Sequence, residues 1–335
     1  MAAGIAAVYL YFVHYAASLM TEAFTITGIL WTVDVATCLA GGLKSSTADQ
    51  GPLGSTELLW YGLQLGVAMG VTLLLRQVVL FFFVAMLLWL VWVAMRYRQL
   101  RTAVPSLLLS GVVVAAMLAP WIWRNYRVFG RLTLPNTNAG FTFFWSNHPI
   151  QGTCFESVLS PERGVSYQEL IPPELRHLNE AQLDRALLRR GLGFVREDPA
   201  RYLLLSLSRI PVFFLFWPTA ESSLLSNAAR VLSFGLFLPF MAYGLVLDAV
   251  RAWRRWRGEG SSASLTLSTS PRFLYGLFIL VYTAIHLASW ANVRYRLPVD
   301  AFLMLFAAYG IEHLFTRLWS RTRATDRAHL ARPCQ

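Results

Sequence analysis

Five charged side chains lie near the ends of apolar segments in this sequence. They are Glu22, Arg76, Arg124, Arg294 and Arg296. Guanidinium groups suit phosphate because they form paired hydrogen bonds with its oxygens. Ionisable residues that converge on one face of a membrane indicate a functional site. These residue types therefore predict a site for an anionic group such as phosphate, with Glu22 as a further substrate contact.

Each of these residues also has a plainer structural explanation. Thr21 and Glu22 open a helix, where a hydroxyl and an acidic side chain are typical capping residues. Arg76 lies in a tight hairpin between two apolar segments, where arginine side chains often extend to the membrane interface. His286 lies about two helical turns before Arg294, and a single helix histidine is more often structural.

The segment from Pro120 to Tyr126 ends an apolar stretch with two tryptophans and a tyrosine. An aromatic belt with a charged anchor explains these rings. It explains the neighbouring pair Arg124 and Asn125 less well, because an anchor needs a charge but no amide. We therefore add Asn125 and Tyr126 to the predicted binding residues.

The composition indicates a membrane protein. Hydrophobic residues make up 56% and charged residues 14% of the 335 residues, and the net charge is +11. The arginines fall between apolar segments, which fits the positive-inside rule and argues against nucleic acid as a partner. The sequence has no glycine-rich phosphate loop, no nucleophile elbow, no metal cluster and no evident cofactor motif, although a divalent metal stays possible.

A membrane-spanning helix needs about 20 mostly apolar residues. That length predicts an all-α, polytopic transmembrane bundle with about eight spans. The spans are expected near residues 2–19, 22–42, 58–74, 78–95, 103–122, 229–250, 272–290 and 298–318.

The orientation of the bundle follows from three arginine-rich segments after the fourth, sixth and last spans, which we place in the cytoplasm. The apolar stretch 201–218 would reverse this parity if it crossed the membrane. It carries Arg209 and Pro211 at its centre, and a lipid-exposed arginine costs about 2.5–3.5 kcal/mol on insertion scales. We therefore expect an interfacial or re-entrant helix there, capped by Asp198 with Pro199 in its first turn.

Four regions follow from this topology. Residues 1–122 hold the N-terminal transmembrane helices, and 123–200 form an extracytoplasmic loop region in which 180–197 can be an amphipathic helix. Residues 201–318 hold the interfacial helix and the C-terminal spans, and 319–335 form a basic cytoplasmic tail. Arg294, Tyr295 and Arg296 then lie on the side that the positive-inside rule disfavours, and phosphate binding would account for that exception.

Four motifs occur in an order that resembles the bacterial relatives of glycosyltransferase family 39. This family includes protein O-mannosyltransferases and the lipid A aminoarabinose transferase. The resemblance covers about residues 16–318. The motifs are Thr21-Glu22, Gly62-Leu-Gln-Leu-Gly66 leading to Leu75-Arg76, Pro120-Trp-Ile-Trp-Arg-Asn-Tyr-Arg-Val-Phe-Gly130, and Arg294-Tyr-Arg-Leu-Pro298.

The resemblance implies a GT-C fold in the bacterial inner membrane with an extracytoplasmic active site. It implies transfer of a sugar from a polyprenyl-phosphate donor to a protein or glycolipid acceptor, usually with inversion of the anomeric centre. The arginines would hold the donor phosphate, and Glu22 would bind a sugar hydroxyl.

The sequence departs from this family pattern at its N-terminus. Relatives begin with an extra helix and an external loop, in which an acidic residue is thought to act as base towards the acceptor. The first acidic residue here is Glu22. We expect the base to lie upstream of Met1 in a longer gene, or the chain to be a truncated relative that cannot turn over alone.

Two other classes of function stay open. An arginine-lined cavity also suits a transporter or flippase of a lipid-linked or anionic solute, although such proteins often have inverted repeats and sites at the membrane midplane. The missing acidic loop would also fit a non-catalytic remnant.

Overall fold

The computed structural model describes residues 1–18, 20–45, 54–157, 166–220, 222–260 and 266–330. In these ranges every regular element is a helix, which confirms the predicted all-α class. The chain divides into two compact units. Unit 1 comprises Met1–Met20, Phe216–Ser268 and Val299–Gln335, and unit 2 comprises Thr21–Leu215 and Thr269–Pro298.

Seven helices in the described part of the chain are long and apolar enough to cross a membrane, which supports the predicted polytopic bundle. They match seven of the expected spans, although helix α6 (Leu100–Phe129) continues beyond the predicted end at residue 122. The seven segments are Thr21–Lys44, Ser55–Leu75, Gln77–Arg96, Leu100–Phe129, Leu224–Gly258, Pro271–Ala288 and Val293–Trp319.

The first expected span, residues 2–19, differs from the prediction. It forms two short helices, α1 (Ala2–Val8) and α2 (Leu10–Ala17), separated by Tyr9 in an extended conformation. The buried Tyr9 hydroxyl donates a hydrogen bond of 2.7 Å to the Asp300 carboxylate within unit 1. This break lies in an unbroken apolar run, so hydropathy alone could not reveal it.

Unit 1 also contains α10 (Leu224–Arg230), the π-helical segment η5 (Val231–Gly235), α11 (Leu236–Glu259) and most of α14 (Val293–Leu330). Helices α11 and α14 approach closely at Gly244. A Cβ atom there would lie 1.9 Å from the carbonyl oxygen of Phe306. A small residue is therefore required at this crossing.

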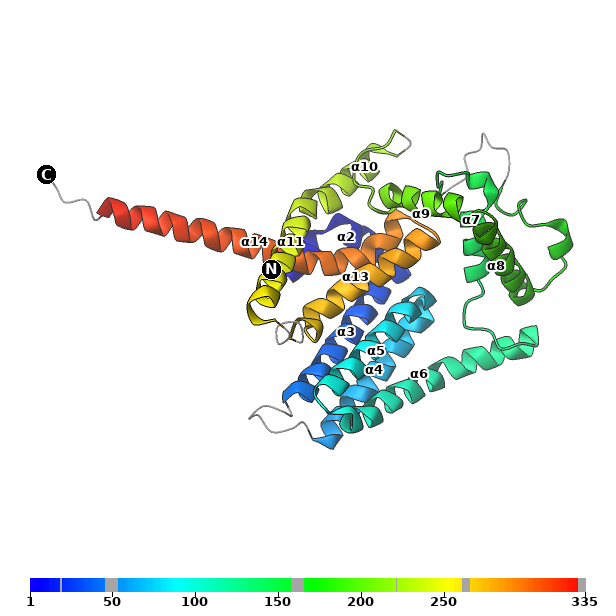
Figure 1. Cartoon of the computed structure of the whole chain (residues 1–335). Coiled ribbons are helices and arrows are strands. Elements are labelled where there is room, and N and C mark those ends of the chain that lie inside the picture. The colour runs from blue at the N-terminus through cyan, green and yellow to red at the C-terminus, as the bar shows by residue number, and fades with distance from the viewer. Residues whose placement is uncertain (19, 46–53, 158–165, 221, 261–265, 331–335) are drawn as a thin grey trace. The chain divides into compact units, whose positions relative to one another are not determined.

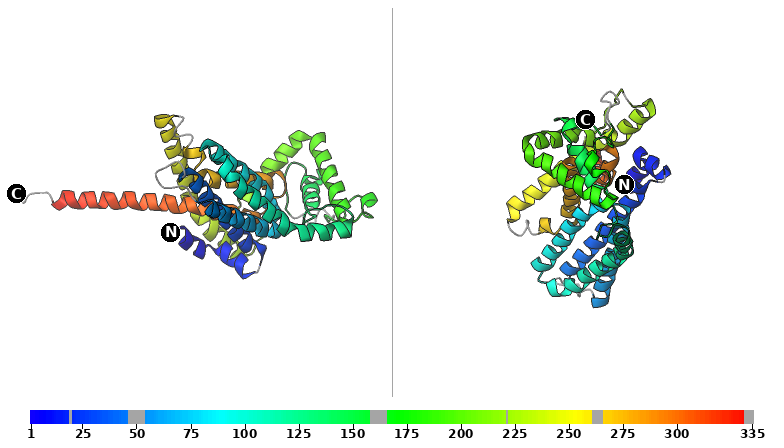
Figure 2. Two further views of the ribbon diagram at one scale, coloured as in Figure 1. Left: turned by 90° about the horizontal axis from the view of Figure 1, so that it is seen from below. Right: turned by 90° about the vertical axis from the view of Figure 1, so that its right-hand side faces the viewer.

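In unit 2 the membrane helices are α3 (Thr21–Ser45), α4 (Ser55–Leu75), α5 (Leu80–Arg96), α6 and α13 (Pro271–Ala288). The helices α3, α4 and α5 lie side by side, and α6 packs along α4 (Figure 1). The same group is seen from two other directions in Figure 2, in blue to cyan. Gly28 of α3 faces Thr72 of α4, so these two helices run antiparallel.

A row of glycines forms the contact between α4 and α6. Gly62 and Gly66 face the backbone of α6 at Ser106 and Ser110. Farther along α4, Gly70 faces the Met117 side chain of α6. The paired positions rise together in both helices, so α4 and α6 run in the same direction. Small residues at such spacing let helix backbones approach closely in a membrane.

A smaller helical region follows α6 and contains α7 (Ala139–Asn147) and α8 (Glu180–Glu197), with the 3-10 turns η2 (Pro149–Gln151) and η4 (Pro173–Leu175). The bounds of α8 match the predicted amphipathic helix. Asp184 of α8 accepts hydrogen bonds from the amides of Gly140 and Phe141, at 2.7 and 3.1 Å, and so satisfies the first turn of α7. Burial raises the pKa of this carboxyl.

The rings of α7 pack inside this region. Phe144 is buried with Ile171 and Leu187, and Phe141 and Trp145 pack against that cluster. Helix α9 (Pro199–Phe213) comes next, and the Asp198 side chain caps it through the amide of Arg201, at 2.9 Å. The predicted cap is confirmed, and the location of α9 at a membrane interface stays a prediction.

The close contact at Gly62 gives a test of the α4 and α6 packing. A Cβ at Gly62 would lie 2.5 Å from the Ser106 carbonyl oxygen, so Gly62→Ala requires backbone movement. We expect it to lower stability by about 1–3 kcal/mol. Gly111 of α6 has open space around its Cβ position. Gly111→Ala should therefore leave stability unchanged or raise it by up to about 1 kcal/mol. Thermal unfolding in detergent compares the two variants, and equal effects would contradict the assigned packing.

Candidate functional site

Three of the predicted residues meet at one end of the helices of unit 2. Glu22 lies in the first turn of α3, Arg76 directly follows α4, and Arg294 lies in the first turn of α14. Both guanidiniums form ion pairs with the same carboxylate oxygen, Glu22 Oε1. The Arg294 Nε to Oε1 distance is 2.5 Å. Segments distant in the sequence are thus joined through one oxygen atom.

The three side chains differ in their exposure to solvent. The Glu22 side chain is 2% exposed, whereas those of Arg76 and Arg294 are 16% and 36% exposed. The carboxylate is therefore buried, whereas both guanidiniums are partly exposed at the protein surface. Arg76 Nε also lies 3.4 Å from the Thr21 hydroxyl oxygen, which accepts this weak hydrogen bond. Thr21 thus contributes to the site by accepting a hydrogen bond from Arg76.

Tyr295 completes this group, which we call the Glu22 cluster: Glu22, Arg76, Arg294 and Tyr295. The Cζ atoms of Arg76 and Arg294 lie 5.4 and 5.6 Å from the centre of the Tyr295 ring, within the range of cation–π interactions. Counting two guanidiniums and one carboxylate, the cluster carries one net positive charge. That charge suits a monoanionic ligand.

Three rings of α13 form a column that packs against Tyr295. His286 stacks on Tyr295 with centroids 5.0 Å apart and planes inclined by 19°. Tyr282 and Phe278 follow at one-turn intervals, with successive centroid distances of 4.8 and 5.2 Å. The sequence alone favours a structural role for His286 as a single helix histidine. The spacing of 278, 282 and 286 was the signal that it shares a face with two other rings.

Arg209 binds the C-terminal end of α13. Its buried guanidinium donates hydrogen bonds to the carbonyls of Leu287 and Ser146, at 2.9 and 2.6 Å, and to the Asn147 side chain at 2.9 Å. Burial lowers its pKa to about 10, so it stays charged at neutral pH. Arg209 would be costly if it were exposed to lipid in a membrane-crossing helix. Here it is enclosed by protein, and its hydrogen bonds offset the free-energy cost of burying its charge.

Arg124, Asn125 and Tyr126 lie together in the last turns of α6 and have different contacts. Arg124 lies over the Trp121 ring at 5.4 Å and donates to the Asn125 side-chain oxygen at 3.2 Å. The buried Asn125 amide donates to the carbonyl of Leu134, at 3.1 Å, and so ties the end of the helix to the following segment. This contact gives the Asn125 amide a structural role, which an aromatic belt alone does not explain.

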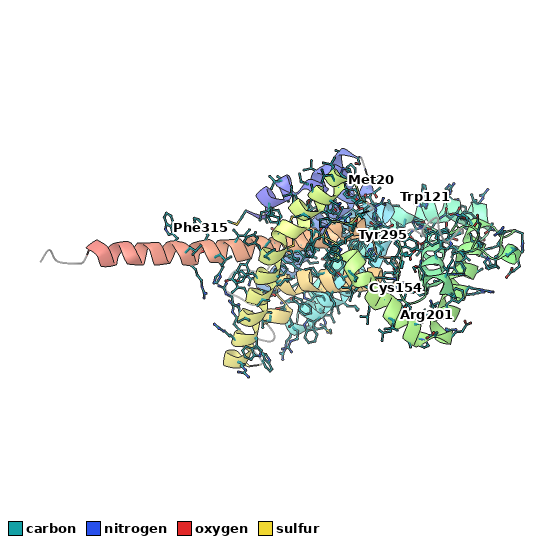
Figure 3. The ribbon with its side chains drawn as sticks, turned by 90° about the horizontal axis from the view of Figure 1, so that it is seen from above. Met20, Trp121, Cys154, Arg201, Tyr295 and Phe315 are labelled. Carbon is teal, nitrogen blue, oxygen red and sulfur yellow. The ribbon has the colours of Figure 1, made fainter. Side chains whose placement is uncertain are left out.

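No observed contact among the described residues joins this segment to the Glu22 cluster. The parallel register of α4 and α6 nevertheless places Arg124 near the level of Arg76 along the bundle. Trp121 and Tyr295 lie on separate elements of unit 2 (Figure 3). The exposed Tyr126 ring lies 6.1 Å from Trp123, as expected in an aromatic belt. The segment is better described as an anchor than as a part of the cluster.

Arg296 has a structural role in the observed contacts. It is fully buried, and its Nη1 donates to the carbonyls of Phe213 and Leu215, at 3.1 and 3.2 Å. These carbonyls belong to the last residues of α9 and the segment after it, which lack helical partners. Arg294 and Arg296 are thus two residues apart in sequence but bind different kinds of group.

The described ranges contain no group of three or more His, Cys, Asp or Glu side chains that could hold a metal ion. The two guanidiniums of the Glu22 cluster, which a buried carboxylate orients, can bind an anion.

Comparison with known proteins returned no match among protein-family models, curated proteins or solved structures.

A double-mutant cycle tests the strength of the central ion pair. We expect Glu22→Gln and Arg76→Met to show a coupling free energy of about 1–3 kcal/mol, because the carboxylate is buried and shared. Unfolding in mixed detergent micelles measures it. The exposed pair Glu174 and Arg190, 4.0 Å apart, is the matched control, and its coupling should be close to zero. Additive effects at Glu22 and Arg76 would contradict the pairing.

Proposed function

We propose that this chain is a membrane glycosyltransferase that moves a sugar from a polyprenyl-phosphate donor to an extracytoplasmic protein or glycolipid acceptor. The observation that carries the proposal is the pairing of Arg76 and Arg294 on the buried Glu22 carboxylate at the end of the membrane helices. The order of the four motifs, which resembles glycosyltransferase family 39, supplies the reaction type.

The charge of the cluster supports a phosphodiester ligand. A sugar joined to a polyprenyl phosphate carries one negative charge, which the single net positive charge of the Glu22 cluster balances. The polyprenyl chain can stay in lipid while the phosphate reaches residues at the helix ends. Guanidiniums bind such oxygens through paired hydrogen bonds.

Transfer requires stabilisation of the leaving phosphate. The acceptor oxygen forms a bond to the anomeric carbon, the bond from that carbon to the phosphate oxygen breaks, and the acceptor proton passes to a base. Arg76 and Arg294 stabilise the charge that grows on the departing polyprenyl phosphate. Glu22 orients both guanidiniums and is not assigned as the base. The resemblance implies an acidic residue as that base.

The location of the cluster favours a transferase over a transporter. Glu22, Arg76 and Arg294 all lie at helix ends, whereas substrate sites of secondary transporters typically lie near the membrane midplane. A site at one face suits a reaction between a lipid-linked donor and a ligand outside the bilayer. We place that face outside the bacterial inner membrane on the arginine distribution.

The catalytic proposal predicts a strong effect of removing either arginine. In a full-length chain reconstituted in liposomes with radiolabelled polyprenyl-phosphate sugar, Arg76→Ala and Arg294→Ala should lower transfer by about 100-fold to 1,000-fold. Arg189→Ala, at an exposed position of α8, is the matched control and should transfer normally. Wild-type turnover in both site variants would refute the proposed roles. Transport of the donor without a sugar product would support a flippase instead.

The orientation predicts which side of the membrane each segment faces. With the native cysteines replaced, a cysteine at Ala139 should react with a membrane-impermeant reagent added from outside, and one at Gly258 should react only after permeabilisation. Both positions are exposed. Labelling of Gly258 from outside would reverse the topology and with it the location of the site.

A further inference from the structure

An acidic side chain lies near the centre of a membrane-spanning helix in unit 2. Asp34 belongs to α3, whose apolar segment Thr21–Lys44 is long enough to cross a membrane. At 1.5 Å per residue, Asp34 is about 20 Å from the start of this segment and about 15 Å from its end. Its side chain is exposed. An acidic group at this depth is costly in lipid, and such residues usually have a partner or face an enclosed cavity.

No basic side chain in the described part of the chain forms an ion pair with Asp34. Asp34 interacts electrostatically with the Cys38 thiol and with the Tyr275 hydroxyl of α13, and neither group carries a positive charge. An aspartate side chain is also too short to reach the membrane surface from the middle of a helix, whereas lysine and arginine can do so near a helix end. The described residues therefore leave the charge of Asp34 uncompensated.

Asp34 is part of an exposed stripe on α3, which we call the Asp34 face. Its members recur at alternating intervals of four and three residues, and all are exposed: Thr27, Trp31, Asp34, Cys38 and Gly41. The other side of α3 is buried against α4, where Gly28 meets Thr72. Alternating intervals of three and four residues are typical of a face that packs along a second helix.

The residue types of the Asp34 face suit contact with a helix in the membrane. Gly41 has open space around its Cβ position and Cys38 is small, so the backbone of a second helix can approach closely here. The Thr27 hydroxyl donates to the Ala23 carbonyl within α3, at 2.9 Å. The unmet requirement for a polar partner on this face therefore comes from Asp34.

The charge of Asp34 selects among the helices that could occupy this face. A second copy of this chain packed face to face would bring two aspartates together in lipid, where like charges oppose association. A helix with a lysine or arginine at its centre would supply the opposite charge together with a hydrogen-bond donor. Charge complementarity thus favours a different polypeptide over a second copy.

We propose that the Asp34 face binds a transmembrane helix of a second protein, and that this helix carries a lysine or arginine near the bilayer centre. Cys38 and Gly41 admit the backbone of the partner helix, and Asp34 pairs with its cation. Asp34 lies about 18 Å along α3 from Glu22. The interaction therefore goes beyond the proposed transfer reaction and does not depend on it.

Matched model helices test the charge requirement. The full chain carries a fluorescent label at its C-terminus and is reconstituted in phosphatidylcholine liposomes. Labelled peptides of about 20 leucines and alanines with tryptophan at both ends are added, and energy transfer reports binding. The peptides differ at the central position, which is lysine, leucine or glutamate. We expect the lysine peptide to bind at least about fivefold more tightly than the other two.

Charge reversal assigns this preference to Asp34. Asp34→Lys should reverse the order, so that the glutamate peptide binds at least about fivefold more tightly than the lysine peptide. Asp34→Leu should bind all three peptides equally. Binding gained by Asp34→Lys also shows that this variant is inserted and folded.

A second pair of variants tests the close approach of the helices. Gly41→Ile adds a bulky side chain to the Asp34 face at a position with open space, and it should weaken binding of the lysine peptide at least about fivefold. Gly111→Ile is the matched control, because Gly111 of α6 is also exposed and has open space around its Cβ position. It should bind the lysine peptide as the wild type does.

The outcomes decide the proposal. Equal binding of the lysine and leucine peptides to the wild type would overturn it. If the glutamate peptide binds as tightly as the lysine peptide, hydrogen bonding between carboxyl groups is sufficient, and a second copy of this chain replaces the cationic partner. A lysine preference that survives Asp34→Leu would locate the binding elsewhere and would likewise reject the Asp34 face.

Discussion

The organisation of unit 2 depends on a single carboxylate oxygen that is shared by two guanidiniums. Glu22 opens α3, Arg76 ends α4 and Arg294 opens α14, so the ion pairs join three helix ends. An isolated buried carboxylate would be very costly, and the two arginines offset that cost. The arginines in turn are held in one geometry, with the Tyr295 ring against both. The same contact therefore joins the helix ends and holds two guanidiniums in position.

The surrounding packing places the ends of these helices together. The glycine row of α4 allows α6 to lie directly against it. Arg209 and Arg296 fix the ends of α13 and α9 through backbone carbonyls, and Phe213 of α9 stacks on His286 of the ring column. Displacement of any of these supports would move the helix ends that carry the Glu22 cluster. The site is thus a product of helix packing more than of any single motif.

The sequence predicted the apolar helices well because their length and composition respond directly to lipid. It also predicted the cap of α9 and the extent of α8, since capping residues and amphipathic spacing are local signals. The sequence did not predict the break at Tyr9, because the hydrogen bond to Asp300 links positions far apart in the chain. Arg294 and Arg296 could not be distinguished for the same reason. Both are arginines near one helix start, and only the three-dimensional contacts show that one meets a carboxylate and the other meets carbonyls.

The carbonyl-binding arginines have a consequence for how membrane topology is read from this chain. Arg201, Arg209, Arg230 and Arg296 each donate to backbone carbonyls where the chain leaves helical geometry. These cations are part of the folded framework and satisfy acceptors that lipid could not. A count of positive charges treats them as if they were free to interact with the membrane surface and the translocation machinery. Arginine in this protein therefore carries two separate kinds of information, about side and about shape, and only the first is governed by the positive-inside rule.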